Sequence, residues 1–464
     1  MSSGFQTLDP TTETLKQSFP FFSPQQTNQA MQLGSVAFST WRSWSIKQRS
    51  HILEAVALDL ENNATYYAAL MAEEMGKPIS QGEAEIQKCA LTCRYYAAHA
   101  AQFLADETEK TEAKYSIVRR DPLGIILTIM PWNFPFWQFF RVAAPALMAG
   151  NVILLKHAAN VPQCALAIER IFQNTKAPSG IVQSLFVSHA EIEKMIAHPE
   201  VKAISLTGSE KAGSTVAKLA GASLKPCVME LGGSDPFLVF DDANLDAAVV
   251  AAATSRLLNS GQSCICAKRF LVHRALMDSF CEKFVAAIKT FVTGNPIDSL
   301  TQLGPLATKA QRDDLHAQVL DAKKHGAQIH CGGKIPDGIG FFYPPTVITH
   351  VNSSMRIWHE ETFGPIATLI SFQTDAEALT IANATPYGLG ASIWTHQPKR
   401  IEDFLQNLEC GMIFINDFVR SDPRLPFGGV KNSGFGRELG KEGLLSFVNT
   451  KTIWESEITN AHLT

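Results

Sequence analysis

The chain has 464 residues, of which 46% are hydrophobic and 18% are charged, and its formal net charge is -4. This length allows two or three domains with sizeable cores, and the composition excludes a disordered chain or a small disulfide-held scaffold. Because the charge is nearly balanced, no long-range attraction draws the protein to nucleic acid or to a membrane surface. We therefore expect an enzyme-sized globular protein with no nucleic-acid partner and no membrane partner.

The N-terminal segment 1–14 has no Lys or Arg, so it resembles neither a secretory signal nor a transit peptide. Nine cysteines form an odd, scattered set, which predicts reduced thiols and a cytoplasmic location. Cys89 and Cys93 are four residues apart on a predicted helix, but no His or carboxylate accompanies them at ligand spacing. We expect these two cysteines to be core residues, and no metal site.

The predicted elements alternate along the chain, beginning with helices around 47–62 and 80–104. Between 123 and 241, short apolar runs alternate with helical segments, and such continuous apolar strands predict a parallel sheet covered on both faces. The expected strands are 124–129, 152–156, 182–187, 203–207 and 237–240. A helix over 244–258, a strand over 269–272 and a helix over 275–291 then predict a second α/β domain.

A glycine-rich turn follows the expected strand 203–207. Gly208 permits a tight turn, Ser209 can cap the next helix, and Gly213 allows close approach of helix and strand. Such a turn suits a dinucleotide phosphate, although its spacing is not the usual G-x-G-x-x-G. An ordinary capped turn is an equally good interpretation of this segment alone.

Two further motifs bring a carboxylate and a thiol, Glu230-Leu-Gly-Gly and Gly-Gln-Ser-Cys264. With them the sequence resembles the aldehyde dehydrogenase superfamily almost from end to end, and most closely its bacterial succinate-semialdehyde dehydrogenases. The motifs that carry the resemblance include Pro131-Trp-Asn-Phe-Pro135, Lys156, Gly208-Ser209, Glu360-Glu-Thr-Phe-Gly-Pro365, Pro426-Phe-Gly-Gly429 and Ser433-Gly-Phe-Gly-Arg-Glu438. The resemblance implies two open parallel-sheet domains of the Rossmann type and a small β element for oligomerisation.

The resemblance also implies the chemistry. Cys264 matches the family nucleophile, whose thiolate attacks an aldehyde to form a thiohemiacetal and then a thioester. The Asn133 amide and the Cys264 backbone N–H match the donors that stabilise the oxyanion. Glu230 matches the general base that hydrolyses the thioester, and Glu438 is expected to assist proton transfer. Read singly, Cys264 and Glu230 could be a small core residue and a surface charge, and Asn133 could cap a turn.

The resemblance implies NADP or NAD as the cofactor. NAD-selective members commonly carry Glu three residues after the position of Lys156, where this chain has Ala159. Without an acid there, nothing repels a 2′-phosphate, so we expect NADP to be accepted. The expected cofactor-binding residues are Trp132, Lys156, Ala159, Gly208, Ser209, Gly213, Glu361 and Phe363.

The substrate is expected to carry a carboxylate, because Arg141 matches an Arg of succinate-semialdehyde dehydrogenases and offers a bidentate fork. A second family Arg, six residues before the nucleophile, is replaced by Leu258. Ser421 and Arg424, in the loop before Pro426, are the candidates for a compensating contact. A surface salt bridge is the alternative interpretation of Arg141.

Cys266 lies two residues after the nucleophile and is a candidate redox switch. Some succinate-semialdehyde dehydrogenases close the same Cys-x-Cys as an inactivating disulfide, and the strain of so tight a ring should make it readily reducible. A packed, inert Cys266 is the alternative.

The expected domains are a dinucleotide-binding domain over 1–112 and 128–229, a catalytic domain over 230–445, and an oligomerisation element over 113–127 and 446–464. A projecting strand with a free edge invites pairing, so a homodimer or homotetramer is expected. Three alternatives stay open: a dehydrogenase for glutarate semialdehyde or a general aliphatic aldehyde, a CoA-acylating relative, and a catalytically silent binding protein. Glu230 argues against the second alternative, and the joint presence of Cys264, Glu230 and Asn133 argues against the third.

Overall fold

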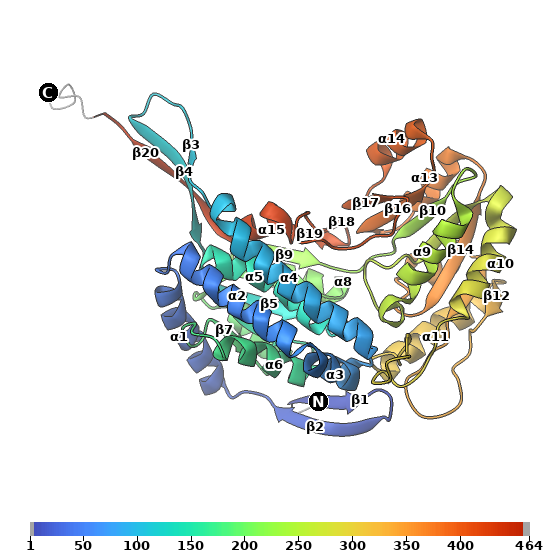
Figure 1. The fold of residues 1–464 in the computed structure, drawn as a ribbon, viewed down its shortest axis with the longest axis horizontal. Coiled ribbons are helices and arrows are strands. Elements are labelled where there is room, and N and C mark those ends of the chain that lie inside the picture. The colour runs from blue at the N-terminus through green and yellow to red at the C-terminus, as the bar shows by residue number, and fades with distance from the viewer. Residues whose placement is uncertain (1–3, 458–464) are drawn as a thin grey trace.

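The computed structural model describes residues 4–457 and has two parallel sheets, each with helices against it, and a small antiparallel sheet that projects from the body (Figure 1). The predicted α/β class is confirmed. Within residues 4–457, every helix is too short or too polar to cross a membrane.

The first sheet has the strand order β19-β9-β8-β5-β6-β7 and is parallel except for β19 at one edge. Its inner strands are buried along almost their whole length, as a parallel sheet covered on both faces requires. In chain order its strands are β5 (Ile125–Met130), β6 (Val152–His157), β7 (Val182–Ser184), β8 (Val201–Thr207), β9 (Cys227–Glu230) and β19 (Gly434–Phe435).

Helices surround this sheet, and one of them is buried on all sides. α5 begins at Pro135, directly after the Pro131–Asn133 turn, and has no exposed residue, because α2 and α4 form a further layer over it. The helices of this half are α1 (Pro24–Trp41), α2 (Ile46–Asn62), α3 (Ala64–Met75), α4 (Ile79–Phe103), α5 (Pro135–Ala149), α6 (Pro162–Gln173), α7 (His189–Ala197) and α8 (Glu210–Ala222).

The second sheet has the order β12-β13-β14-β11-β10-β16-β17 and is parallel except for β12. Its strands are β10 (Pro236–Val239), β11 (Arg269–His273), β12 (Gln328–Cys331), β13 (Thr346–Thr349), β14 (Ile366–Phe372), β16 (Gly390–Trp394) and β17 (Met412–Ile415). Its helices are α9 (Leu245–Leu257), α10 (Met277–Ile288), α11 (Lys309–Lys324), α12 (Arg356–His359), α13 (Asp375–Asn383) and α14 (Pro398–Asn407), with 3-10 turns η1 (Leu258–Gly261) and η2 (Arg274–Leu276). A short pair, β15 (Tyr387–Gly388) and β18 (Val430–Lys431), and α15 (Gly440–Leu445) complete this part of the chain.

The small projecting sheet pairs β20 (Val448–Glu455), β4 (Tyr115–Pro122) and β3 (Glu107–Thr108) in that order (Figure 1). β4 and β20 lie within the ranges expected for an oligomerisation element, whereas β3 lies in the range 1–112 expected for the dinucleotide-binding domain. Residues 458–464 of the expected element lie outside the described residues. The expected range 113–127 extends too far, because Ile125 already pairs with Val152 in the first sheet.

An N-terminal hairpin was not expected from the sequence. It consists of β1 (Gly4–Asp9) and β2 (Thr14–Pro20), and it contacts both halves of the molecule. The Gln6 amide donates to the Ala159 carbonyl at 3.1 Å, while the Pro10 carbonyl accepts from the Phe341 amide at 2.9 Å.

Candidate active site

The candidate site lies where three neighbouring strands of the first sheet end. β5, β8 and β9 end at Met130, Thr207 and Glu230, and the turns after them line one cavity of about 290 Å³, here called the first cavity. Ligands of open α/β sheets bind at this carboxyl edge. The turns contribute Pro131, Trp132, Asn133, Gly208, Ser209, Leu231 and Gly232 to its lining.

Cys264 stands between two cavities. It lines the first cavity and also a second cavity of about 280 Å³, formed by α4, α5 and the loop 418–421. Burial raises the pKa of the Cys264 thiol to about 12, whereas the charges of Arg141 and Lys268 lower it. A thiol in this position can meet a ligand from either side.

The loop before Cys264 has an unusual backbone that holds Asn133. Asn259 and Ser260 both have φ of 54°, a left-handed conformation that is uncommon outside glycine. Asn259 Nδ2 donates to the Asn133 carbonyl at 2.7 Å, and Asn133 Nδ2 donates to the Gln262 carbonyl at 3.1 Å. The structure thus brings Asn133 and the Cys264 loop together from distant parts of the sequence.

Lys268 supports this loop and was not identified from the sequence. Its buried Nζ donates to the carbonyls of Ser263 at 3.0 Å and Cys264 at 2.7 Å. The same ammonium forms an ion pair with Glu361 Oε1 at 3.1 Å, and Glu361 lines the first cavity. A lysine inside the apolar segment after Cys264 was the signal in the sequence, since a buried lysine requires partners.

Glu230 is buried at the end of β9 and lines neither the first nor the second cavity. Neither carboxyl oxygen has a hydrogen-bond partner among residues 4–457. The carboxyl lies beside Gly428, where an added Cβ would be 2.6 Å from its Oε1. Burial, followed by repulsion from Glu438, raises the pKa of Glu230 well above the usual carboxyl range.

Arg141 lines the second cavity, and its guanidinium is paired with another predicted site residue. Its Nε forms an ion pair with Glu438, and both side chains are only 1% exposed. Arg141 also lies over the Phe427 ring, 4.2 Å from its centroid, and donates to Thr207 Oγ1 at 3.3 Å. This arrangement places Glu438 behind Arg141, close to Glu230.

Two predicted substrate-binding residues lie in the loop after β17, and only one of them lines the second cavity. Ser421 is buried in the second cavity, where its Oγ accepts a hydrogen bond from Lys88 Nζ at 2.6 Å. Arg424 is exposed, pairs with Asp422 at 2.6 Å, and does not line the cavity. Lys88, a cation that was not identified from the sequence, lines the cavity instead.

The nucleotide side of the site continues into a third cavity of about 410 Å³ beside α8. Ser209 lines both the first and the third cavity and caps α8, accepting from the Ala212 amide at 3.3 Å. Lys156 lines the third cavity, and burial lowers its pKa to about 8. Ala159 is exposed and lies outside this cavity. Two cavities that meet at a helix N-terminus, with a lysine beyond, fit an extended ligand that carries phosphates.

The remaining predicted residues are placed as follows. Gly213 packs against Leu231 so closely that a Cβ would clash with its side chain. Trp132 and Phe363 both line the first cavity and contact each other edge to face, with ring centroids 5.7 Å apart. Cys266 is buried, is a free thiol like Cys264, and donates from Sγ to the Ser263 carbonyl at 2.8 Å.

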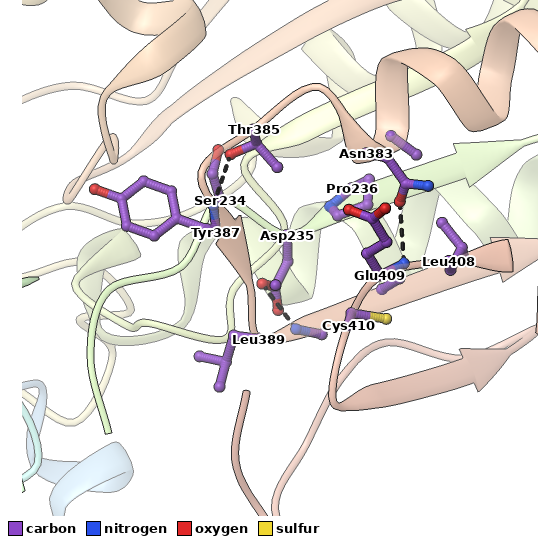
Figure 2. A pocket seen from close by; sticks show the side chains of 14 residues that line it. Ser234, Asp235, Pro236, Asn383, Thr385, Tyr387, Leu389, Leu408, Glu409 and Cys410 are labelled. Atoms are coloured by element: carbon purple, nitrogen blue, oxygen red, sulfur yellow. Dashed lines mark hydrogen bonds between the residues drawn. The ribbon is translucent and has the colours of Figure 1, made fainter. Parts of the chain in front are cut away.

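A separate small pocket lies around Asp235 (Figure 2). Asp235 Oδ1 accepts from the Gly390 amide at 3.1 Å, and burial raises the pKa of this carboxyl to about 7. None of the predicted site residues lines this pocket. Many of the residues expected from the sequence line the first, second or third cavity, whereas Glu230, Glu438, Cys266, Gly213, Ala159 and Arg424 line none of the three.

A dinucleotide-type sheet whose ligand edge meets a cysteine is an arrangement typical of nucleotide-dependent enzymes. The model of the aldehyde dehydrogenase family matches residues 1–453. The chain is 47% identical over 451 residues to a Mycobacterium tuberculosis protein named succinate-semialdehyde dehydrogenase [NADP(+)] 1, covering 97% of this chain and 99% of the relative. It is 46% identical over 452 residues to the Mycobacterium avium succinate-semialdehyde dehydrogenase [NADP(+)], covering 97% and 96%.

A solved structure shares the whole fold. The succinic semialdehyde dehydrogenase from Streptococcus pyogenes, in complex with NADP+, matches with a TM-score of 0.95 at 34% identity, covering 98% of this chain and 100% of that chain. The chain belongs to the aldehyde dehydrogenase family, as its sequence motifs predicted, and it is an aldehyde dehydrogenase.

Proposed function

We propose that this aldehyde dehydrogenase oxidises succinate semialdehyde to succinate with NADP or NAD. The observation that carries the proposal is the position of Cys264 between a nucleotide-type cavity and a second cavity that contains Lys88 and Arg141. Cations that line a cavity of this size favour a small substrate with a carboxylate. The names of the mycobacterial relatives support the same substrate.

The proposed reaction begins with loss of the Cys264 thiol proton to water, after which the thiolate attacks the aldehyde carbon and forms a thiohemiacetal. Its oxyanion needs preorganised donors. Asn133 has a second amide N–H besides the one bonded to Gln262, and the Cys264 backbone N–H is the other proposed donor. Loss of one such donor typically lowers the rate by about 10² to 10³.

When bound, the nicotinamide group accepts the hydride from the substrate carbon. The first and third cavities would hold the cofactor, with Trp132, Phe363, Glu361, Ser209 and Lys156 as contacts. Loss of hydride converts the thiohemiacetal on Cys264 into a thioester, which water then hydrolyses.

Glu230 is the proposed general base for that water. Its raised pKa makes the ionised carboxylate a stronger base than an ordinary carboxylate. Because the Glu230 carboxyl lies beside Gly428 and lines neither cavity, it has to turn toward Cys264 to act. Glu438, buried next to Glu230 and paired with Arg141, is the proposed second group of a proton relay.

NADP is the proposed preferred cofactor. Ala159 brings no carboxylate to the neighbourhood of Lys156, and Lys211 joins Lys156 in the third cavity. Glu193 also lines this cavity, so two cations face one acid, and this excess of positive charge favours a 2′-phosphate. A kcat/KM strongly in favour of NAD would contradict this preference.

A homodimer or homotetramer is the proposed assembly. Strand β20 pairs only with β4 among the described residues, so its other edge is free to pair with a further subunit. Size-exclusion chromatography with light scattering tests this, and a monomer at micromolar concentration would contradict it.

The substrate is tested by initial rates of NADPH and NADH formation with succinate semialdehyde, glutarate semialdehyde, butanal and benzaldehyde. Butanal matters most because it has the same chain length without the carboxylate. We expect succinate semialdehyde to exceed butanal in kcat/KM by about a hundredfold, equivalent to about 2.7 kcal/mol. Equal values would identify a general aliphatic aldehyde dehydrogenase, and a higher value for glutarate semialdehyde would identify the longer substrate.

A further inference from the structure

Lys268 is buried four residues after Cys264, and each of its ammonium protons has an acceptor. Its Nζ donates to the Ser263 carbonyl at 3.0 Å and to the Cys264 carbonyl at 2.7 Å, and it lies 3.1 Å from Glu361 Oε1. An ammonium group has three N–H donors, so these three contacts account for all of them. The lysine is therefore held in one position, where it joins the Cys264 loop to Glu361.

The Ser263 carbonyl belongs to the same peptide unit as the Cys264 N–H. In a trans peptide the C=O and the N–H point in opposite directions, and residues 4–457 contain no cis peptide bond. Lys268 and the Cys266 thiol both donate to this carbonyl, at 3.0 and 2.8 Å, so the Cys264 N–H points away from them. Hydrogen bonds to a carbonyl also polarise its peptide unit, which makes the N–H a stronger donor.

The Cys264 N–H itself is available to a ligand. Within residues 4–457 it has no hydrogen-bond acceptor. An oxyanion donor works best when it is oriented before the negative charge develops, because no reorganisation is then needed during the reaction. A peptide unit that is fixed at its carbonyl and open at its N–H meets this requirement, and Lys268 supplies the charged donor that fixes it.

On its other side, Lys268 fixes the carboxylate of Glu361. Oε1 of Glu361 also accepts from the Gly233 amide at 3.2 Å. Oε2 lies beside Gly232, where an added Cβ would be 2.6 Å from it. Since Oε1 has two donors, Oε2 is the oxygen that can accept from a hydroxyl of a cofactor in the first cavity, which Glu361 lines.

The ammonium of Lys268 keeps its charge in spite of its burial. Burial lowers the pKa of this group, but Cys266, Glu361 and Asp235 raise it, and the result is a pKa above the ordinary lysine value. Hydrogen bonds from a charged donor are stronger than those from a neutral one. Loss of this charge should therefore loosen both the Cys264 loop and Glu361.

We propose that Lys268 is a positioning residue that orients two parts of the reaction at once, the Cys264 N–H as oxyanion donor and Glu361 as cofactor contact. Lys268 lines none of the three cavities, so it acts through these two groups. The inference deepens the proposed function and rests on it, since it presupposes an oxyanion formed at Cys264 and a cofactor bound beside Glu361.

The test compares Lys268→Met with the wild type in two measurements. A single-turnover experiment, with enzyme in excess over succinate semialdehyde and with saturating NADP, gives the rate constant of NADPH formation without any contribution from thioester hydrolysis. Quenching of protein fluorescence by NADP, without aldehyde, gives the Kd of the cofactor, because Trp132 lines the first cavity.

Lys268→Met should change both values. The single-turnover rate constant should fall about 10- to 100-fold, which is less than the effect of removing an oxyanion donor, because the donor is loosened and not removed. The Kd for NADP should rise about 3- to 10-fold, the value of one hydrogen bond. Lys268→Arg keeps the charge and the donors, so it should recover part of both values.

Lys225→Met is the matched control. Lys225 also donates from Nζ to two backbone carbonyls, those of Ile196 and His198, but it lines none of the three cavities. This variant should keep the rate constant and the Kd within about twofold of the wild type. Thermal unfolding checks each variant, and if Lys268→Met does not fold, Lys268→Gln replaces it with the same expected direction, since its amide cannot bind all three acceptors.

A double variant separates the two effects of Lys268. In a Glu361→Ala background, Lys268→Met should still lower the single-turnover rate constant, because the Ser263 carbonyl still loses its charged donor. It should not raise the Kd for NADP any further, because the carboxylate that Lys268 orients is already gone.

The outcomes separate the inference from the function on which it rests. If Lys268→Met lowers thermal stability but keeps the wild-type rate constant and Kd, Lys268 has only a structural role and the inference is overturned. If Lys268→Met has no effect on the rate constant in the Glu361→Ala background, the role at the oxyanion donor is wrong. A wild type that forms no NADPH from succinate semialdehyde contradicts the proposed function instead, and the same comparison is then made with the aldehyde and cofactor that the enzyme does use.

Discussion

Arg141 and Glu438 form a buried ion pair at the back of the second cavity, 297 positions apart in the sequence. The pair joins α5 to the segment after β19. It places the Glu438 carboxylate, neutralised by Arg141, next to Glu230. Removal of one partner from a buried pair leaves an uncompensated charge, which typically costs about 3 to 5 kcal/mol.

The first prediction follows from this pair. Arg141→Met should lower the thermal unfolding temperature because it leaves Glu438 unpaired beside Glu230, and it should reduce kcat/KM for succinate semialdehyde more than for butanal because the second cavity loses a cation. The double variant Arg141→Met/Glu438→Gln should recover part of the lost stability, since no charge is then left buried. Calorimetry and initial rates measure both effects. Equal losses on the two substrates would show that Arg141 does not bind the substrate carboxylate.

The second prediction concerns Glu230. Glu230→Gln should still form the thioester but hydrolyse it slowly, so a rapid-mixing experiment should show a burst of about one NADPH per active site followed by slow turnover. Because burial raises the pKa of Glu230, wild-type kcat should increase with pH into a range above that of an ordinary carboxyl group. If Glu230→Gln shows no burst of NADPH, Glu230 acts in a step before hydride transfer and not in hydrolysis of the thioester.

The third prediction concerns Cys266, whose thiol donates to the Ser263 carbonyl in the reduced structure. Peroxide should inactivate the wild type and dithiothreitol should restore its activity, if Cys264 and Cys266 close a strained disulfide. Cys266→Ala should lose activity without recovery, since its Cys264 sulfenic acid has no nearby thiol and is oxidised further. Equal recovery in both proteins, measured after peroxide removal, would exclude the switch.

The fourth prediction concerns His157 at the end of β6. Its Nδ1 accepts from the Ala158 amide at 2.9 Å and its Nε2 lies 3.0 Å from the Pro135 carbonyl, which together require a neutral ring with the proton on Nε2. Burial lowers its pKa to about 4, below the unfolded value near 6.5. The stability from this residue is therefore complete above pH 6.5 and is lost as pH falls toward 4, by up to about 3 kcal/mol.

Thermal unfolding between pH 7 and 4 measures this effect. His157→Gln has an amide that can donate and accept but does not titrate, so its unfolding temperature should fall less steeply over that interval. Parallel slopes for the two proteins would show that His157 does not contribute to the acid sensitivity.

Much of the fold could be predicted because strand and helix periodicity is local. The strands at Val152 and Arg269 and the helix that ends at Asn62 begin or end within a residue or two of their expected positions. The N-terminal hairpin was missed because β2 is mostly exposed and carries no apolar alternation. Its stability comes from contacts with distant residues such as Ala159 and Phe341.

Site residues such as Cys264 could be predicted because a sequence motif marks them. Residues whose role depends on contacts with distant parts of the chain were missed. Lys88 and Lys268 are single lysines in ordinary helical and strand-edge sequence, and only the folded chain shows their partners. For the same reason the sequence could not show that Arg424 pairs with Asp422, outside the cavity, or that Arg141 is held by Glu438.

The N-terminal hairpin also bears on how the two halves of the enzyme can move. One of its backbone hydrogen bonds goes to Ala159, three residues after Lys156 of the third cavity, and another goes to Phe341 in the half that carries Cys264. The Glu13 side chain adds a third, since its Oε1 accepts from the Gly340 amide at 2.9 Å. Any hinge opening that widens the gap between Ala159 and Phe341 has to break these hydrogen bonds, so residues 4–20 limit how far the two halves can separate.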